Sequence, residues 1–336
     1  MATHRRSQMC DLFHWHRGGA HVRSGVVRAV VVSRPGGPEV LRVVDLPTPE
    51  PGPGEVRIRT RAAAVNPTDT AFRQLGPDPA EGVPQPWIPG MELAGTVDAT
   101  GAGVDWRPGQ RVMAIVTPRR PQGGAYAEQV VVPADGVAAT PDGVGDAEAA
   151  TLPRNGLTVW AALRMLALSP GQVLGVTGAA GAVGGYAIEL GKLAGLRVVA
   201  QAAVRDEDLV RRLGADVVVP RDDDAAAAFR AAVPGGVDGL LDAAVLDERA
   251  LGAVRDGGAL ATVRFWSGPS ERGIRVEPVM VRHHLHEAKG LADLASLAEA
   301  GSLTLRVAEV LPAERASEAH ARLESGGIRG RLVLAF

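Results

Sequence analysis

A glycine-rich segment between an expected strand and an expected helix constrains this chain more than any other feature. It reads VLGVTGAAGAVGGYAIEL from Val173, with glycines at 178, 181 and 184. Glycine lets such a turn adopt positive φ and approach a pyrophosphate, and the helix that follows offers free N–H groups to the anion. Between a strand and a helix, this spacing indicates a dinucleotide site, although in a chain with 42 glycines these residues could also serve the turn alone.

The residues after Asp146 alternate between strand-like and helix-like segments. They include expected helices at Glu207–Leu213, Asp222–Ala232 and near Asp247–Val254, strands at Asp216–Val219 and near Leu305–Leu311, and a helix opened by Pro312. Alternation of this length predicts a parallel, doubly wound α/β sheet.

The part from Val27 to about Thr151 has a different texture. Short β-branched runs such as Val27–Val32 are separated by turns rich in glycine and proline. We expect an all-β unit here, a partly open barrel. Residues 1–25 have little periodicity, and we expect a disordered tail there.

The end of the second strand of the dinucleotide unit indicates which cofactor binds. A carboxylate there would accept hydrogen bonds from the ribose 2′-hydroxyl of NAD, but the position near Ala202 carries no charge. Arg205 follows, and a guanidinium can pair with a 2′-phosphate. This favours NADPH (NADP), unless Arg205 is only a solvated charge beside Asp206.

Composition narrows the possible partners and compartment. The net charge is −2 and aromatic residues make up 4%, so nothing indicates nucleic acid or a membrane as partner. The single cysteine, Cys10, excludes an intramolecular disulfide and fits a reducing compartment. We therefore expect a cytoplasmic protein with a small-molecule substrate.

Several further segments together resemble one family. VNPTD (65–69), IPGMELAGTV (88–97), GGAYAE (123–128), GLTVWAAL (156–163) and AHARLESGGIRGRLVL (319–334) are similar to its signatures. The chain resembles the zinc-independent quinone oxidoreductases, of the zeta-crystallin kind, within the medium-chain dehydrogenase/reductase superfamily. The resemblance runs from about Arg28 to Phe336.

The resemblance implies a GroES-like β-barrel catalytic domain plus a doubly wound Rossmann domain, and a homodimer. It places the first part of the catalytic domain at 26–151, the NADP-binding domain at 152–282 and the C-terminal part of the catalytic domain at 283–336. It also implies hydride transfer from the nicotinamide to a quinone or α,β-unsaturated carbonyl substrate in a cleft between the domains.

The same resemblance implies that no zinc is bound. Zinc-dependent relatives have a cysteine and a histidine where this chain has Asn66 and Met91. A catalytic zinc needs about three protein ligands, and Glu92 alone cannot supply them.

The resemblance also assigns roles to individual residues. Asn66 would be catalytic, bonding near the nicotinamide and the substrate carbonyl, unless it only caps the turn before Pro67. The expected cofactor-binding residues are Asn66, Thr158, Gly178, Ala180, Gly181, Ala182, Val183, Arg205, Val245, Thr262 and Arg331. Arg331 could instead be a solvated strand residue.

Three departures from the family pattern leave a second hypothesis open. Pro77 stands about where many quinone reductases have a tyrosine, Pro220 stands where some relatives have an adenine-stacking tyrosine, and Arg264 replaces a small residue beside the cleft. The proton for reduction would then come from water or Asp69. The alternative is a non-redox NADP(H)-binding protein, or a redox-neutral biosynthetic enzyme on the same fold.

Overall fold

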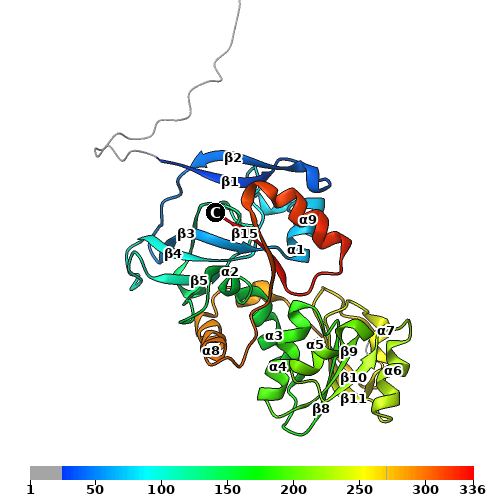
Figure 1. Cartoon of the computed structure of the whole chain (residues 1–336). Coiled ribbons are helices and arrows are strands. Elements are labelled where there is room, and N and C mark those ends of the chain that lie inside the picture. Colours follow the sequence, from blue (N-terminus) through cyan, green and yellow to red (C-terminus); the bar gives the residue numbers. More distant parts are fainter. Residues whose placement is uncertain (1–24, 270) are drawn as a thin grey trace, which may run out of the picture.

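Two large β-sheets organise the described residues, which are 25–269 and 271–336 of the computed structural model (Figure 1). One sheet is parallel and the other is mixed, and a two-stranded sheet lies beside the mixed one. The expected disordered tail falls outside the described residues except for Gly25.

The parallel sheet has the strand order of a dinucleotide-binding domain. In space it runs β10 (Val217–Pro220), β9 (Arg197–Ala202), β8 (Val173–Thr177), β11 (Val237–Asp242), β12 (Val254–Thr262) and β13 (Arg275–Pro278). In chain order this is 3-2-1-4-5-6, with the reversal between the first and fourth strands. The carboxyl ends of β8 and β11 meet at that reversal, where this fold binds nucleotides.

Helices cover both faces of the parallel sheet because its strands are apolar on both sides. In β9, Val198 and Ala200 pack into the core cluster that holds α3 (Pro153–Leu166) and α4 (Ala182–Leu193). Val199 between them packs into the cluster of α6 (Ala225–Ala232) and α7 (Glu248–Leu251). Successive side chains of a strand point to opposite faces, so the sheet is sandwiched between helices.

The mixed sheet forms the GroES-like barrel. Its order is β14 (Val307–Pro312), β15 (Arg331–Ala335), β3 (Glu55–Ala64), β4 (Glu92–Thr100), β5 (Arg111–Ile115) and β7 (Val137–Ala139), and β6 (Gln129–Pro133) also pairs with β3. The C-terminal strand β15 pairs antiparallel with β3, so the end of the chain returns to the barrel. Beside it, β1 (Val26–Val32) and β2 (Leu41–Pro47) pair antiparallel.

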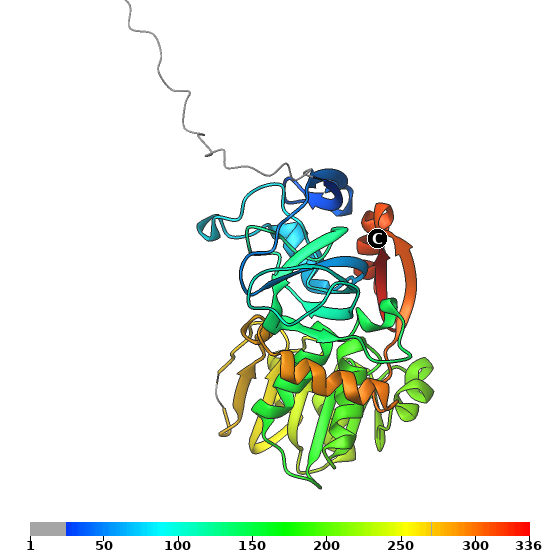
Figure 2. The same ribbon diagram turned by 90° about the vertical axis from the view of Figure 1, so that its left-hand side faces the viewer.

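The remaining helices surround the barrel and its junction with the parallel sheet. They are α1 (Pro67–Leu75), α2 (Asp146–Ala149), α8 (Ala288–Glu299) and α9 (Ala316–Ser325), whereas α5 (Glu207–Arg212) packs on β9 and β10 of the parallel sheet. α8 contacts both β7 of the barrel and α3, and so bridges the two sheets (Figure 2). The fold is thus a GroES-like barrel plus a doubly wound Rossmann domain, which confirms the predicted fold class.

Two local predictions were wrong, and a third was right. The N-terminal unit is not all β, because α1 begins after Asn66, whose side chain forms a capping box with Asp69, and Pro67 occupies the first helical turn. The helix expected near Asp247–Val254 is only α7, since Val254 already opens β12. Pro312 ends β14 and also caps a short 3-10 helix, Ala313–Arg315, which continues into α9, as the sequence predicted.

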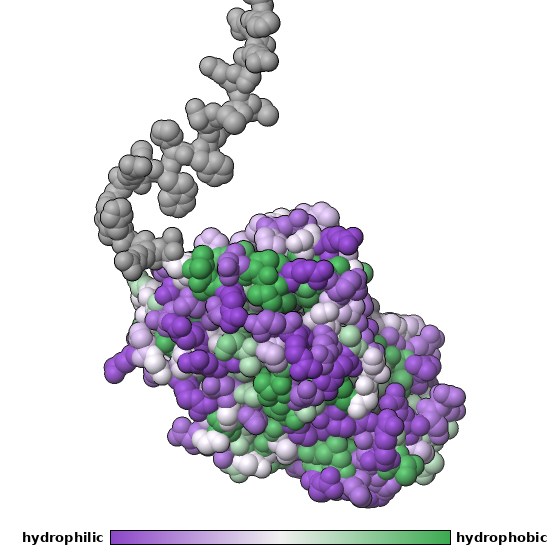
Figure 3. Space-filling view, turned by 45° about the horizontal axis from the view of Figure 1, so that its top comes forward, coloured by the Kyte–Doolittle hydropathy of each residue, from purple (hydrophilic) through white to green (hydrophobic). Residues whose placement is uncertain are grey.

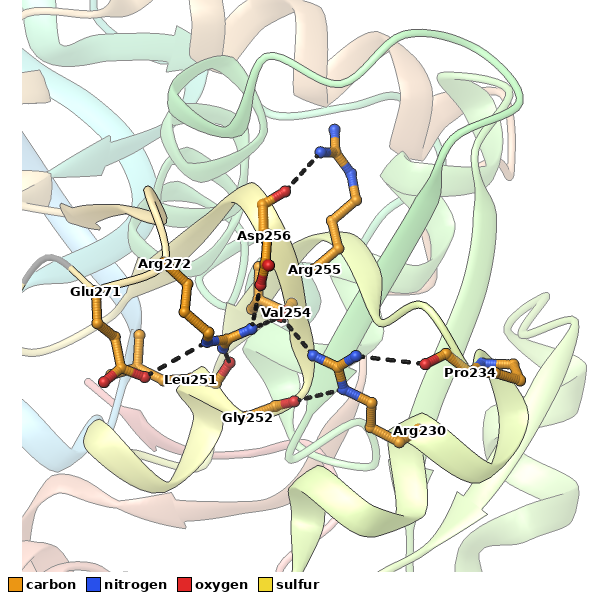
Figure 4. Close-up of polar contacts among 9 residues, drawn as sticks. All are labelled: Arg230, Pro234, Leu251, Gly252, Val254, Arg255, Asp256, Glu271 and Arg272. Carbon is orange, nitrogen blue, oxygen red and sulfur yellow. Dashed lines mark hydrogen bonds and ion pairs between the residues drawn. The ribbon is translucent and has the colours of Figure 1, made fainter.

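Two arginines fix the start of β12 from opposite sides (Figure 4). Arg230 of α6 donates to the carbonyl oxygens of Gly252 at 2.8 Å and Val254 at 3.0 Å. Arg272 donates to the carbonyl oxygens of Leu251 at 2.6 Å and Val254 at 3.0 Å. Both guanidinium groups satisfy carbonyls that α7 and β12 leave unpaired, at the sheet end opposite the nucleotide edge.

The surface mixes polar and apolar side chains. On the face in Figure 3, small hydrophobic areas are interspersed among hydrophilic residues. Among the described helices, none is both long and apolar enough to cross a membrane.

Candidate dinucleotide and substrate site

The turn between β8 and α4 has the shape that a pyrophosphate requires. Gly178 has φ +58, and a Cβ on it would lie 3.1 Å from the backbone of Ala243. A Cβ on Gly184 would lie only 2.4 Å from the carbonyl oxygen of Gly178, so α4 packs directly against the turn. The first-turn amides of α4, including those of Ala182 and Val183, have no intrahelical acceptor and border a cavity. These residues fit a dinucleotide's phosphates.

An arginine from the C-terminal part of the chain holds this turn from outside. Arg306, just before β14, donates to the carbonyl oxygens of Ala180 at 3.1 Å and Gly181 at 2.6 Å. Burial lowers the pKa of Arg306. Arg306 therefore holds the carbonyl side of the turn, while the amides of Ala182 and Val183 at the start of α4 have no acceptor within the helix.

The loop after β11 forms the opposite wall. Thr177 donates to Asp242 at 2.6 Å, Asp242 accepts the amide of Leu246 at 2.6 Å, and the hydroxyl of Thr177 accepts the amide of Ala244 at 3.0 Å. These bonds hold Val245 at φ +59, a conformation that is costly for a β-branched residue. Val245 thereby faces the cavity beside the glycine turn.

The cavity at this edge of the sheet has a volume of about 230 Å³. Of the residues predicted from sequence to bind the cofactor, it brings together Thr158, Gly178, Gly181, Ala182, Val183, Val245 and Arg331. Four others do not border it, namely Asn66, Ala180, Arg205 and Thr262. The hydroxyl of Thr262 instead donates to the carbonyls of Arg264 and Trp266, and so shapes the loop after β12.

Arg205 lies where the second strand of the unit ends. It is exposed in a short 3-10 turn, Val204–Asp206, directly after β9. The one carboxylate in that turn, Asp206, is bound by Arg329 at 2.5 and 2.6 Å, and this bond lowers the pKa of Asp206. Arg221, after β10, also acts electrostatically on Asp206 and is exposed. Two exposed arginines therefore follow the ends of β9 and β10, at the edge of the parallel sheet where the cavity lies.

A buried polar cluster joins the barrel to the nucleotide-binding part. Glu92 of β4 accepts bonds from the side-chain amides of Asn66 at 2.8 Å and Asn155 at 2.9 Å, and from the backbone amide of Arg154 at 2.7 Å. Asn155 in turn accepts from Arg331 of β15 at 2.5 Å. Burial raises the pKa of Glu92 and lowers that of Arg331 to about 10. The cluster fixes the relative positions of β4, α1, α3 and β15.

Asp69, the candidate proton donor, belongs to a second buried chain of contacts. It accepts the backbone amide of Asn66 at 2.8 Å and the hydroxyl of Tyr126 at 3.3 Å, and Tyr126 also contacts Nε2 of His320 at 3.3 Å. Burial raises the pKa of Asp69 to about 7 and, with the charge of Arg73, lowers that of His320 to about 3. Asp69 borders neither cavity described here.

A second cavity, of about 320 Å³, continues from the first. Both are bordered by Pro67, Thr68, Arg154, Val263, Arg264, Val279 and Val281. Its other walls include Leu75, Met91, Ile115, Phe265 and Met280, so it is mostly apolar. The hydroxyl of Thr68 is buried and has no hydrogen-bond partner among the described residues. An apolar compartment next to a dinucleotide cavity suits a hydrophobic substrate.

Sequence reasoning missed two residues of this region. Arg154 borders both cavities and Asn155 joins Glu92 to Arg331. Both sit at the start of α3, after the helix-opening Pro153, and polar residues just inside a helix start were the available signal.

A GroES-like barrel joined to a Rossmann sheet, with a glycine-turn cavity opening into an apolar one, defines the class of NAD(P)-dependent dehydrogenases and reductases. Family models agree with this class. Residues 52–142 match the alcohol dehydrogenase GroES-like domain, and residues 213–334 match the zinc-binding dehydrogenase domain.

Individual proteins narrow the class. A chloroplastic quinone-oxidoreductase homolog of Spinacia oleracea is 34% identical over 55% of this chain and 57% of its own length. The NADPH-dependent alkenal/one oxidoreductase of Arabidopsis thaliana, also chloroplastic, is 31% identical over 70% of this chain and 62% of its own. A solved mycobacterial quinone oxidoreductase is 30% identical, with a TM-score of 0.78, covering 92% of this chain and 100% of its own.

The chain belongs to the medium-chain dehydrogenase/reductase superfamily and is quinone oxidoreductase-like. This confirms the resemblance found in the sequence. The family is one of oxidoreductases that bind NAD(P)H.

Proposed function

We propose that this protein is an NADPH-dependent, zinc-independent reductase of quinones or α,β-unsaturated carbonyl compounds. The observation that carries the proposal is the continuity of the two cavities. The glycine turn borders the first, the second is mostly apolar, and Pro67, Thr68 and Val263 lie on both. A conjugated substrate in the second cavity would therefore lie against the end of a dinucleotide bound in the first.

The preference for NADPH rests on the charges at the end of β9. Ala202 and Ala203 stand where a ribose-binding carboxylate would be, and Arg205 and Arg221 are exposed nearby. Asp206 is engaged by Arg329 and so is not free to accept a ribose hydroxyl. Exposed guanidinium groups beside a strand end with no free ribose-binding carboxylate favour a 2′-phosphate.

The donors around Glu92 support zinc independence. All three of its partners present N–H groups, from Asn66, Asn155 and Arg154, and a metal ion would meet these hydrogens instead of lone pairs. Within residues 25–269 and 271–336, no group of three or more His, Cys, Asp or Glu side chains could hold a metal. These residues do not fit a zinc ion.

When bound, the nicotinamide cofactor would supply the hydride for reduction of the electron-poor carbon of the substrate. The chain would bind and orient both molecules. Thr68 borders both cavities, and rotation of its side chain would turn the buried, unpartnered hydroxyl toward the substrate carbonyl. Val263 and Val279 would line the junction with apolar surface. Because Asp69 does not reach the cavities, we assign the second hydrogen, a proton, to water.

The test is oxidation of the reduced cofactor, followed by absorbance, with phenanthrenequinone and a series of short enones. Turnover with NADPH that exceeds turnover with NADH is the expected result. Calorimetric titration of NADPH runs in parallel. Tight binding without oxidation by any substrate would favour the alternative, a non-redox NADP(H)-binding protein or a redox-neutral enzyme.

A further inference from the structure

Among the residues that the structure describes, arginines border the second cavity and acidic residues do not. Arg119, Arg154, Arg264 and Arg282 all contribute to its wall, whereas no Asp or Glu does. A cleft lined by one sign of charge raises the local concentration of the opposite sign. A neutral quinone would make no use of this field.

Within the described residues, only one of these arginines takes part in an ion pair. Arg119 forms an ion pair with Glu81 at 2.7 Å. In the same part of the chain, the guanidinium groups of Arg154, Arg264 and Arg282 take part in no ion pair. The buried carboxylates of Glu92 and Asp69 act electrostatically on Arg154, and its Nε is buried without a hydrogen-bond partner. Arg264 forms no ion pair with Asp247, although its charge acts to lower the pKa of that carboxyl group.

The cofactor phosphates do not account for all of this charge. The glycine turn from Gly178 to Gly184 borders the first cavity and not the second. Conversely, Arg282 borders the second cavity and not the first, and its guanidinium lies 5.6 Å from the ring centroid of Phe265, another wall residue. Arg282 is thereby held at the substrate side, away from the pyrophosphate position.

We propose that the substrate carries an anionic oxygen group, carboxylate or phosphate, which binds to Arg264 and Arg282, with Arg154 at the junction of the two cavities. The inference rests on the proposed reductase function and narrows its substrate class. Guanidinium groups bind such anions through charge-assisted and often bidentate hydrogen bonds. The apolar walls would take the conjugated carbonyl part.

The experiment compares matched substrates with and without the anion. β-Benzoylacrylic acid is set against its methyl ester for a carboxylate, and crotonyl-CoA against crotonyl-N-acetylcysteamine for a phosphate. Each pair is measured in the native chain and in the double variant Arg264→Gln/Arg282→Gln. We expect the double variant to reduce kcat/KM for the anionic member about tenfold or more relative to the neutral member. The pair that shows this loss identifies the source of the anion.

The control is Arg275→Gln, because Arg275 is an exposed arginine, paired with Glu277, that borders neither cavity. It should leave the anionic-to-neutral ratio unchanged. If the neutral members are reduced and the double variant changes neither ratio, the anion site is refuted and the reductase function stands.

Binding separates this inference from the reaction itself. The saturated acid, β-benzoylpropionate, and its methyl ester are titrated into the protein with NADP⁺ by calorimetry. Tighter binding of the acid, lost in the double variant, would uphold the anion site even if no substrate were reduced. Crotonyl-CoA and crotonyl-N-acetylcysteamine are titrated in the same way. Equal binding of the acid and its ester, together with equal binding of these two thioesters, would overturn the anion site.

Discussion

The side-chain amide of Asn66 donates to Oε1 of Glu92 at 2.8 Å, and both residues are fully buried. This bond joins the start of α1 to the start of β4. Arg154 and Asn155 of α3 also donate hydrogen bonds to Glu92, so α3 is held at the same point. The amide that sequence reasoning assigned to the nicotinamide is therefore engaged inside the protein, and Pro67 and Thr68 border the cavities instead. The catalytic role of Asn66 stays a prediction.

Glu92→Gln should destabilise the fold. Glu92 accepts three N–H donors, and a glutamine would turn its own N–H₂ group toward at least one of them. Two buried N–H donors that face each other leave at least one hydrogen bond unmade, which costs about 1–3 kcal/mol of folding free energy. Urea unfolding measures the change, with Glu318→Gln as an exposed control. Equal stability of Glu92→Gln and the native chain would contradict the assigned contacts.

Arg205→Ala should weaken NADPH far more than NADH, because only NADPH has the 2′-phosphate. A charge-assisted contact of this kind corresponds to roughly a tenfold or greater change in Kd. Calorimetric Kd values for both cofactors are compared with those of Arg212→Ala, another exposed arginine nearby on α5. A similar loss for both cofactors would argue against the 2′-phosphate contact.

Arg306→Gln should weaken NADPH binding although Arg306 does not border the cavity. Its two bonds to Ala180 and Gly181 hold the glycine turn, so their loss leaves the turn amides less ordered. We expect a several-fold rise in Kd, of the order of one neutral hydrogen bond. Arg322→Gln, on the exposed side of α9, serves as the control. An unchanged Kd would show that the turn holds its shape without Arg306.

Gly184→Ala should impair cofactor binding more than folding. The new methyl would lie 2.4 Å from the carbonyl oxygen of Gly178, so α4 must move away from the turn. Gly235→Ala is the matched control, since a Cβ there meets nothing within 4 Å. NADPH affinity is measured together with the unfolding midpoint. Native affinity in Gly184→Ala would mean that the turn and α4 are not in the contact described.

His320→Gln should reduce the sensitivity of the fold to acid. The pKa of His320 is lowered to about 3, so between that pH and its unfolded pKa near 6.5 only the unfolded chain takes up the proton. Stability from this group is complete above about pH 6.5 and falls as pH decreases. At about pH 5 the loss is roughly 2 kcal/mol.

Asp69 acts in the opposite sense, because its pKa is raised to about 7 and the folded state keeps the proton as pH falls. Asp69 is present in the native chain and in the His320→Gln variant, so its contribution cancels when the two are compared. The quantity to measure is therefore the difference in unfolding free energy between the variant and the native chain. That difference should shift in favour of the variant by roughly 2 kcal/mol from about pH 7.5 to about pH 5. A constant difference would refute the buried neutral histidine.

The sequence by itself determined the parts of this protein that depend on local patterns. Glycine spacing between a strand and a helix predicted the dinucleotide turn, because phosphate approach needs backbone freedom at those positions. Alternating strands and helices predicted the parallel sheet. The capping signal Asn66–Pro67–Asp69 was present too, and it would have predicted α1.

Only the tertiary structure decided which distant residues meet. Arg306 and the glycine turn are more than a hundred residues apart, as are Asn155 and Arg331, and no local pattern pairs them. The joining of the two cavities at Thr68 and Arg154 likewise depends on how the barrel packs against the parallel sheet. Local sequence sets backbone preferences over a few residues, whereas long-range contacts follow from packing the whole chain, and these contacts define the site.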